Sequence, residues 1–498
     1  MKKWVFGIML ILLLSGCRRY PLPAGDGKAP PVQDEEGNRD SLAKGREENW
    51  DFSAKGMEGG QALPSQGEGS PQGLLGQEGE GSQALAAGGE AFAGQDGQIL
   101  SGETAAPEKE RIPVKVKGIY LSAYMAGSSQ AMEKVLGQLK DTELNAVVID
   151  VKDDEGHVTF QMDSPIVQEV GSCVNYIPDI GSLLVALKEQ GVYCIARIPA
   201  FRDPFLANAR PEWCLKKADG SIYRDRNNLA WVNPYKKEVW EYLLEIAEEA
   251  GRAGFDEIQF DYIRFCTEKG MDQVVFQEED TKGKSRQEII LEFTDFAYGR
   301  LKDKGLFVSA DVFGAVIHSS QDGQAVGQDY REMAKRLDYI CPMVYPSHYG
   351  NGNFGIPCPD TQPYETVYHA LLDSVKVLSS PAGSSQGEEA AKGEGQELMD
   401  PDGIRGTVRP WLQDFTASYL PRYIPYGPTQ VREQIQAVYD AGYEEWILWS
   451  AAGNYHYGGL LPSQAEQAAQ AAEQEAQAGE QEAQAAEQAR IMEGTKEE

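Results

Sequence analysis

Eight short apolar runs, rich in β-branched residues, alternate with longer amphipathic stretches between residues 113 and 460. Short apolar runs are typical of buried strands, and the longer stretches have the periodicity of helices. Several of these stretches end at a glycine just before the next run, as a helix C-cap does. Eight strand–helix units predict an α/β fold, the (β/α)8 TIM barrel. The predicted strands are 116–124, 145–154, 192–201, 256–265, 306–314, 338–346, 407–415 and 444–452.

An open, doubly wound parallel sheet is the alternative arrangement of the same elements. Such sheets carry a glycine-rich phosphate-binding loop after the first strand when they bind dinucleotides. No loop of this kind follows the run 116–124. We therefore expect the barrel, which occupies residues 113–460.

The N-terminus reads MKKWVFGIMLILLLSGC. Its basic start and short apolar run predict a signal peptide, because the run is too short for a comfortable membrane span. Leu14-Ser15-Gly16-Cys17 resembles the lipobox of bacterial lipoproteins. The resemblance implies a lipoprotein signal peptide at 1–17, diacylation of Cys17 and an extracytoplasmic, membrane-anchored protein. The alternative is an ordinary signal peptide with a chance cysteine.

Three segments have compositions that cannot build a packed core. Residues 18–112 are rich in Gly, Glu, Gln, Ser and Pro, which predicts a disordered linker. Residues 379–404 have a similar composition and predict a flexible insert in the barrel. The tail 461–498 is rich in Ala, Glu and Gln; it favours helix but is polar on every face, without an apolar coiled-coil seam.

Charge and metal-ligand spacing exclude several classes of function. The net charge is −31, from 77 acidic and 46 basic residues, which argues against nucleic acid as a partner. Five histidines show no metal-ligand spacing, and seven cysteines show neither zinc-knuckle spacing nor a dense disulfide framework. We expect no cofactor.

The apolar run FDEIQFDYIRF, residues 255–265, contains acidic residues. Burying an ionised carboxylate without a partner costs several kcal/mol, so this composition needs a reason. Strand side chains alternate between two faces. Ile258 and Phe260 are therefore expected to face the helices, while Gln259 and Asp261 point into the barrel.

The same alternation applies to two other runs. In 306–314 it directs Asp311 inward, and in 145–154 it places Asp150 and Lys152 on the face opposite Val147. TIM-barrel enzymes hold their catalytic residues at the C-terminal ends of the strands. Three strands that each present a carboxylate there predict a site.

Asp261 and Asp311 are the candidate catalytic pair, because they lie on neighbouring predicted strands. Two carboxyls beside a sugar ring supply the acid and the nucleophile or base of glycoside hydrolysis, and crowding raises the pKa of one. A structural network is the alternative, in which the acids pair with lysine or arginine. Residues expected to position the acids or bind sugar are Asp150, Lys152, Arg197, Arg264, Gln413, Tyr120, Tyr345, Trp411 and Trp449.

The chain from 113 to 456 resembles a bacterial domain family of unknown function, a TIM-barrel domain similar to glycoside hydrolases. The matching blocks are KGIYLSAY, LNAVVIDVKDDEG, FDEIQFDYIRF, ADVFG, DYICPMVYPSHY and RPWLQDF. The resemblance implies a polysaccharide or oligosaccharide substrate. The fourth-strand block is also similar to the α-amylase strand that bears the nucleophile, which implies Asp261 as nucleophile and Asp311 as acid/base. This chain departs from both patterns. Amylase-type enzymes carry Glu on the fifth strand, where this chain has Asp311. Chitinase-type enzymes carry a Glu on the fourth strand, where this chain has Ile263.

Two hypotheses follow from the sequence. The first is a lipid-anchored glycoside hydrolase that acts on an envelope or environmental polysaccharide. The second is a glycan-binding or scaffold lipoprotein without catalysis. Neither hypothesis requires a cofactor.

Overall fold

The computed structural model describes residues 111–380, 403–468 and 477. The predicted signal peptide 1–17 lies outside the described residues, and so do nearly all of the linker 18–112 and most of the insert 379–404. The tail 461–498 is described only as far as residue 468 and at residue 477.

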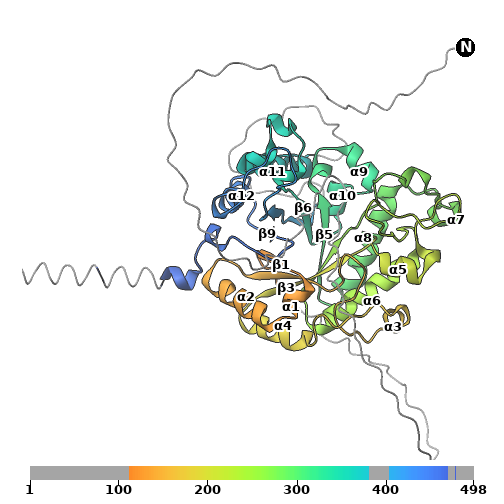
Figure 1. Cartoon of the computed structure of the whole chain (residues 1–498), viewed down its shortest axis with the longest axis horizontal. Helices are drawn as coiled ribbons and strands as arrows, with labels where there is room; N and C mark the ends of the chain where they lie inside the picture. Colours follow the sequence, from red (N-terminus) through yellow and green to blue (C-terminus); the bar gives the residue numbers. More distant parts are fainter. Residues whose placement is uncertain (1–110, 381–402, 469–476, 478–498) are drawn as a thin grey trace, which may run out of the picture. The chain divides into compact units, whose positions relative to one another are not determined.

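Parallel strands form a closed barrel, as the sequence predicts. From β1 to β6 each strand pairs with the next, β6 pairs with both β7 and β8, and β9 pairs with β8 and β1 to close the ring. Figure 1 shows the helices around the strands. The strands are β1 Lys117–Leu121, β2 Ala146–Asp150, β3 Tyr193–Pro199, β4 Glu257–Asp261, β5 Phe307–Phe313, β6 Tyr339–Met343, β7 Thr407–Val408, β8 Trp411–Gln413 and β9 Trp446–Trp449.

The seventh predicted strand, 407–415, is divided into β7 and β8. Both segments pair with β6, so together they occupy one position in the barrel. Pro410 separates them. Proline has no backbone N–H, so it cannot donate to a ladder and interrupts the strand there.

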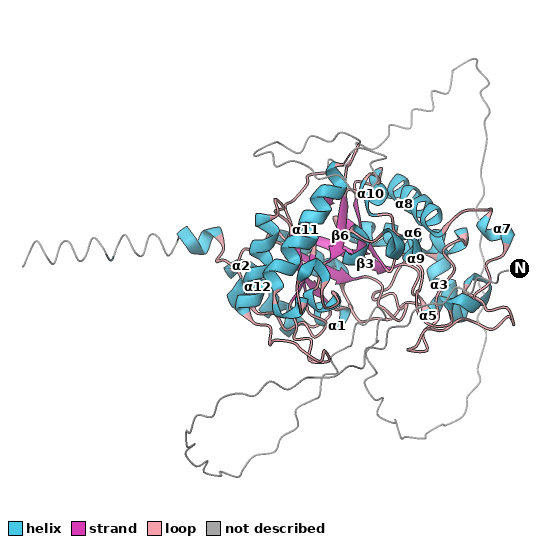
Figure 2. Ribbon diagram, turned by 90° about the horizontal axis from the view of Figure 1, so that it is seen from above, coloured by secondary structure: helices cyan, strands magenta, loops and turns pink. Residues whose placement is uncertain are grey.

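The helices lie between the strands in sequence and cover the outside of the barrel, as the cyan helices around the magenta strands show (Figure 2). Helix α6 begins at Lys237 and ends at Ala253, and Gly254 caps it with φ of 118°, a value that favours glycine. The others are α1 Ala123–Ala126, α2 Ser129–Asp141, α3 Pro165–Val170, α4 Ile180–Glu189, α5 Pro204–Ala209, α7 Glu278–Thr281, α8 Arg286–Lys302, α9 Ser320–Val326, α10 Tyr330–Ala334, α11 Pro363–Ser379 and α12 Pro428–Asp440.

Strand side chains divide into two buried clusters according to their parity. Ile258 and Phe260 belong to the cluster between strands and helices, and the ring of Phe260 lies 5.3 Å from that of Phe293 in α8. The second cluster fills the barrel interior. The inward direction predicted for Gln259 is confirmed by its hydrogen bond to Cys341 Sγ across the barrel.

A buried ionic cluster crosses the barrel interior. Arg409 Nη1 lies 2.8 Å from Glu257, and its Nε lies 2.8 Å from Glu445. The guanidinium also stacks on the ring of Tyr339 at 3.8 Å. Arg409 is fully buried, so it is a structural residue of the interior.

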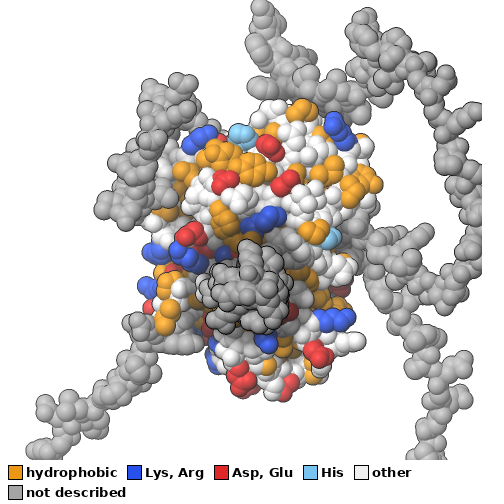
Figure 3. Space-filling view, turned by 90° about the vertical axis from the view of Figure 1, so that its left-hand side faces the viewer, with side chains coloured by type: hydrophobic (Ala, Val, Ile, Leu, Met, Phe, Trp, Pro, Cys, Tyr) orange, Lys and Arg blue, Asp and Glu red, His pale blue; other side chains and the backbone are white. Residues whose placement is uncertain are grey.

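The surface of the barrel mixes side chains of opposite charge. Figure 3 shows basic, acidic and hydrophobic side chains interspersed over one face of the molecule. Within the described residues, no helix has both the length and the apolar character needed to cross a membrane.

Replacing Arg409 with methionine should destabilise the fold by about 3–5 kcal/mol, since Glu257 and Glu445 lose their buried cation. Chemical denaturation would measure the change. The deficit should shrink as the pH falls, because protonated carboxyls no longer need a positive partner.

Arg210→Met is the matched control. Arg210 pairs with the exposed Glu169, and such pairs contribute about 1 kcal/mol or less. A loss at Arg409 no larger than the loss at Arg210 would contradict the role of the interior cluster.

Candidate active site

A pocket lies over the C-terminal ends of the strands, the end where barrel enzymes hold their catalytic groups. Seven residues predicted for the site line it: Arg197, Arg264, Asp261, Asp311, Tyr345, Trp411 and Trp449. The loops and strand ends add Tyr262, Phe313, Gly314, Ala315, Met343, His348, Tyr349 and Phe415.

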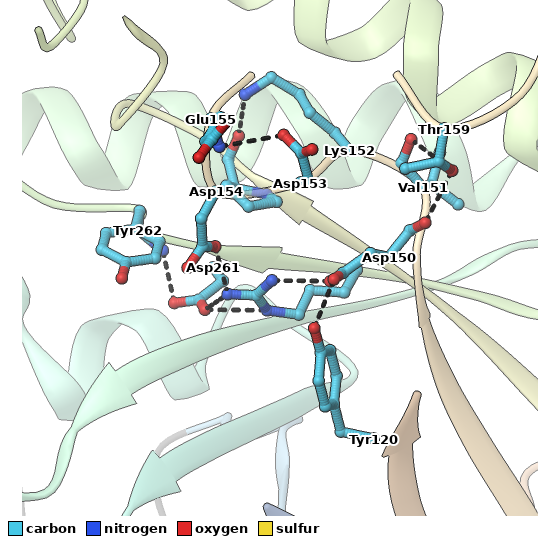
Figure 4. A network of polar contacts seen from close by, with 12 residues as sticks. Tyr120, Asp150, Val151, Lys152, Asp153, Asp154, Glu155, Thr159, Asp261 and Tyr262 are labelled. Carbon is cyan, nitrogen blue, oxygen red and sulfur yellow. Dashed lines mark hydrogen bonds and ion pairs between the residues drawn. The ribbon is translucent and has the colours of Figure 1, made fainter. Parts of the chain in front are cut away.

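Arg197 on β3 binds three carboxylates. Its Nη1 lies 2.7 Å from Asp150, and its Nη2 lies 2.9 Å from Asp154. Asp261 Oδ2 accepts from both Nη2, at 2.5 Å, and Nε, at 3.0 Å. The three acids point toward a common centre in Figure 4. One guanidinium therefore fixes groups from β2, the loop after β2, and β4.

Asp150 is held from two sides. Tyr120 on β1 donates its hydroxyl to Asp150 Oδ2 at 2.5 Å, opposite the bond from Arg197. Burial raises the pKa of Asp150, and although Arg197 opposes this, the pKa remains at about 7. The predicted positioning role of Asp150 thus has a geometric basis, because it orients Arg197.

Asp154 is part of the network and was not among the residues predicted from the sequence. Burial would raise its pKa, but Arg197 and Arg202 outweigh burial and hold the pKa below its usual range. Arg202 also donates to the hydroxyl of Tyr262. The consecutive acids Asp153 and Asp154 at the end of the predicted strand 145–154 were the available sequence signal.

Asp261 ends β4 and is followed by a strained residue. Tyr262 has φ of 47°, in the left-handed region that non-glycine residues seldom adopt. In this conformation the Tyr262 N–H donates to Asp261 Oδ1 at 2.6 Å. Ala200 N–H donates to the Asp261 carbonyl at 2.7 Å. The turn therefore aims the carboxylate into the pocket.

Asp311 on β5 lies level with Asp261. The register pairs Phe260 with Ala310, and continuing it by one residue places the two acids side by side on neighbouring strands. Trp411 Nε1–H donates to Asp311 Oδ1 at 2.6 Å. Burial, followed by repulsion from Asp261, raises the pKa of Asp311 well above its usual range. Asp311 can therefore hold a proton at a pH where free aspartate is ionised.

Aromatic rings line much of the pocket. Trp449 packs against Tyr120 with ring centres 4.2 Å apart and ring planes tilted by 31°, and it meets Trp411 edge to face at 5.6 Å. Tyr345 contacts His348 in a T-shaped pair at 4.9 Å. Burial lowers the pKa of His348 to about 3, so its ring is neutral at ordinary pH.

Arg264 forms no ion pair with Asp261. The ion pair to Asp261 comes from Arg197. Arg264 instead donates from Nη1 to the carbonyl of Phe265 at 3.0 Å, and its guanidinium lies against aromatic rings.

Lys152 and Gln413 lie away from the pocket. Lys152 pairs with Asp203 at 2.9 Å and donates to the carbonyl of Pro199. Gln413 binds Ser347 N–H and Asp360 beneath the loops after β6. Both side chains are fully buried in these contacts, and neither is among the residues that line the pocket.

In the described part of the chain, no group of three or more His, Cys, Asp or Glu side chains is arranged to hold a metal ion. The six cysteines between Cys173 and Cys358 are free thiols.

Solved structures provide several similar chains. A hypothetical protein from Ruminiclostridium thermocellum is 38% identical; the match covers 39% of this chain and 97% of that one, with a TM-score of 0.36. The glycoside hydrolase domain of PgaB (BpsB) from Bordetella bronchiseptica is 14% identical, with coverage of 68% and 94% and a TM-score of 0.45. The spore cortex-lytic enzyme SleL of Bacillus megaterium is 13% identical, with coverage of 69% and 72% and a TM-score of 0.38.

Comparison with curated proteins gives no match to the chain. A family model described as "Putative glycosyl hydrolase domain" matches residues 118–455, about two thirds of the sequence. This match begins in β1 and ends beyond β9, so it spans the whole barrel and every acid of the pocket. The chain therefore belongs to this glycosyl hydrolase domain family.

Proposed function

We propose that the protein is a glycoside hydrolase that cleaves an envelope or environmental polysaccharide, with Asp311 as general acid and Asp261 as nucleophile. The observation that carries the proposal is the contrast between two neighbouring carboxyls. Asp311 is buried beside a tryptophan N–H and has a raised pKa, whereas Asp261 is bound by a guanidinium. Pairs of acids in such different environments divide the acid and nucleophile roles.

Asp311 would donate its proton to the glycosidic oxygen as the bond to the anomeric carbon breaks. The proton leaves a carboxylate in a buried site, where Trp411 Nε1–H stabilises the new negative charge. The same carboxylate can then remove a proton from water in the second step.

Asp261 would attack the anomeric carbon and form the glycosyl-enzyme intermediate. Two hydrogen bonds from Arg197 and one from Tyr262 N–H hold the carboxylate in position before substrate binds. Level positions on neighbouring strands put the backbones of Asp261 and Asp311 about 5 Å apart, which suits the short carboxyl separation of retaining enzymes.

The aromatic walls would bind the sugar. Pyranose rings present an apolar C–H face, and Trp449, Tyr345 and Phe415 offer aromatic surface within the same pocket as the acids. Neutral His348 adds a polar group beside Tyr345 that can exchange hydrogen bonds with hydroxyls.

A second candidate function is glycan binding without turnover. It is favoured by the low exposure of the acid side chains, 12% for Asp261, and by the engagement of that carboxylate with Arg197. Binding of glycans with no cleavage product would support this function over hydrolysis.

We also propose that Cys17 carries a lipid and holds the enzyme on the outer side of a bacterial membrane. The support is the Leu-Ser-Gly-Cys sequence after an apolar run, which lies outside the described residues.

Asp311→Asn and Asp261→Asn should each lower kcat by about 10²–10⁴-fold, because each removes a group that acts on the reacting bond. A panel of polysaccharides would first be screened with the wild type to find a substrate, and kcat would then be measured by the release of reducing ends. Because the proposed mechanism retains configuration, the first product that the wild type releases should have the same anomeric configuration as the substrate.

Asp256→Asn is the control for this pair, since Asp256 precedes β4 and pairs with Lys188 at the other end of the strand. It should retain full activity. Unchanged turnover in the double variant of Asp261 and Asp311 would show that other residues perform the reaction.

Trp411→Phe should move the alkaline limb of kcat/KM to higher pH. The indole N–H favours the ionised form of Asp311, so its loss raises the pKa of Asp311 further and keeps the acid protonated longer. The pH profile would be measured on one soluble substrate. Trp449→Phe, which removes no bond to Asp311, should weaken substrate binding without moving the limb. A downward shift in Trp411→Phe would contradict the role of Asp311.

Cys17→Ser should prevent lipidation and release the protein from the membrane fraction. Metabolic labelling with an alkyne fatty acid, followed by fractionation of cells, would test this expectation. Ser15→Ala serves as control, because it keeps the lipobox cysteine. Membrane attachment that is unaffected by Cys17→Ser would rule out this anchor.

A further inference from the structure

Arg264 is a buried cation without a carboxylate partner. It lies three residues after β4, lines the pocket and is only 4% exposed. Across residues 111–380 and 403–468, no carboxylate comes within ion-pair distance of it, whereas Arg197, Arg202 and Arg409 each pair with at least one acid. Burying an unpaired charge is costly, so this position is unusual for a purely structural residue.

Three aromatic rings surround the guanidinium. Its Cζ lies 4.5 Å from the ring centre of Phe313, 4.9 Å from Trp231 and 5.3 Å from Tyr262. The faces of these rings attract the positive charge, but the rings accept no hydrogen bonds from the N–H groups in the guanidinium plane. Of those donors, Nη1 reaches the Phe265 carbonyl, which is the one hydrogen bond that the side chain makes to described residues.

The two arginines that line the pocket differ in their partners. Arg197 is bound by Asp261 and two further acids. Burial raises the pKa of Asp311 and lowers the pKa of His348 to about 3, so it favours the neutral form of each group. Arg264 feels the charge of the nearby Asp261, but among the described residues no carboxylate forms a direct ion pair with it. A negatively charged ligand would supply the direct ion pair that Arg264 lacks, and such a pair is strong in a site of low dielectric constant.

We propose that the pocket binds a sugar residue that carries a carboxylate, and that Arg264 pairs with this carboxylate. The inference rests on the proposed function, because it places the sugar beside Asp261 and Asp311. The planar fork of arginine matches a carboxylate with two parallel N–H···O bonds, and aromatic packing fixes the orientation of that fork. The carboxylate is either that of a uronic acid or that of a lactyl ether on an amino sugar.

The experiment compares matched pairs of oligosaccharides with the full-length protein. One pair is an oligogalacturonide and its methyl ester; the other is an oligosaccharide of alternating N-acetylglucosamine and N-acetylmuramic acid and a chitin oligosaccharide of equal length. The dissociation constant is measured by calorimetry and kcat/KM by product release. The wild type should prefer the carboxylate member of one pair by about 10- to 100-fold, as expected for a charge-assisted bond.

Arg264→Gln should abolish this preference by weakening binding of the carboxylate member far more than binding of the neutral member, while Arg264→Lys should retain part of it. Arg286→Gln is the matched control: Arg286 also lies over an aromatic ring, Phe265, and donates to a backbone carbonyl, but outside the pocket. It should keep the full preference. Thermal unfolding confirms that each variant is folded, and Arg264→Lys decides the result if Arg264→Gln does not fold.

The outcomes separate this inference from the proposed function. A preference that depends on Arg264 but comes without cleavage would support the carboxylate site and contradict the proposed hydrolase function. Cleavage of neutral and charged members at equal rates overturns the carboxylate site and keeps the hydrolase. Equal losses on both members in Arg264→Gln, or no binding of any oligosaccharide, also overturn the inference.

Discussion

The guanidinium of Arg197 is the contact on which the pocket depends. It joins Asp150, Asp154 and Asp261, and so connects two strands and a loop through the side chain of a third strand. Charge-assisted bonds of this kind are strong where water is excluded, but each acid would be costly to bury alone. The geometry of the acid pair is therefore a property of the network and is not set by Asp261 alone.

Alternation along the strands was sufficient to predict much of this arrangement. Asp261 and Gln259 point inward and Ile258 and Phe260 meet the helices because β4 is regular as far as Asp261. Lys152 shows where the rule stops. Strand β2 ends at Asp150, so the parity of the strand no longer applies two residues later, and Lys152 turns to Asp203.

Other parts of the site depend on segments that the sequence does not bring together. Gln413 has the inward parity of β8, but residues after β6 cover it and bind its side chain. Asp154 and Arg202 follow strands in loops whose path no periodicity describes. Arg264 was predicted near Asp261 by spacing, while its aromatic surroundings come from Trp231 and Phe313, which are distant in sequence.

Pairing between β1 and β9 has a consequence for how the chain reaches its folded state. Lys117 lies opposite Trp446, so the ring closes only after about 330 residues of intervening chain have been made and have left the ribosome. Until then the edges of β1 and β8 have free backbone donors and acceptors that can pair with another chain. A newly made molecule is therefore most prone to association just before its last strand is in place, and the solubility conferred by its excess of acidic residues is useful at that stage.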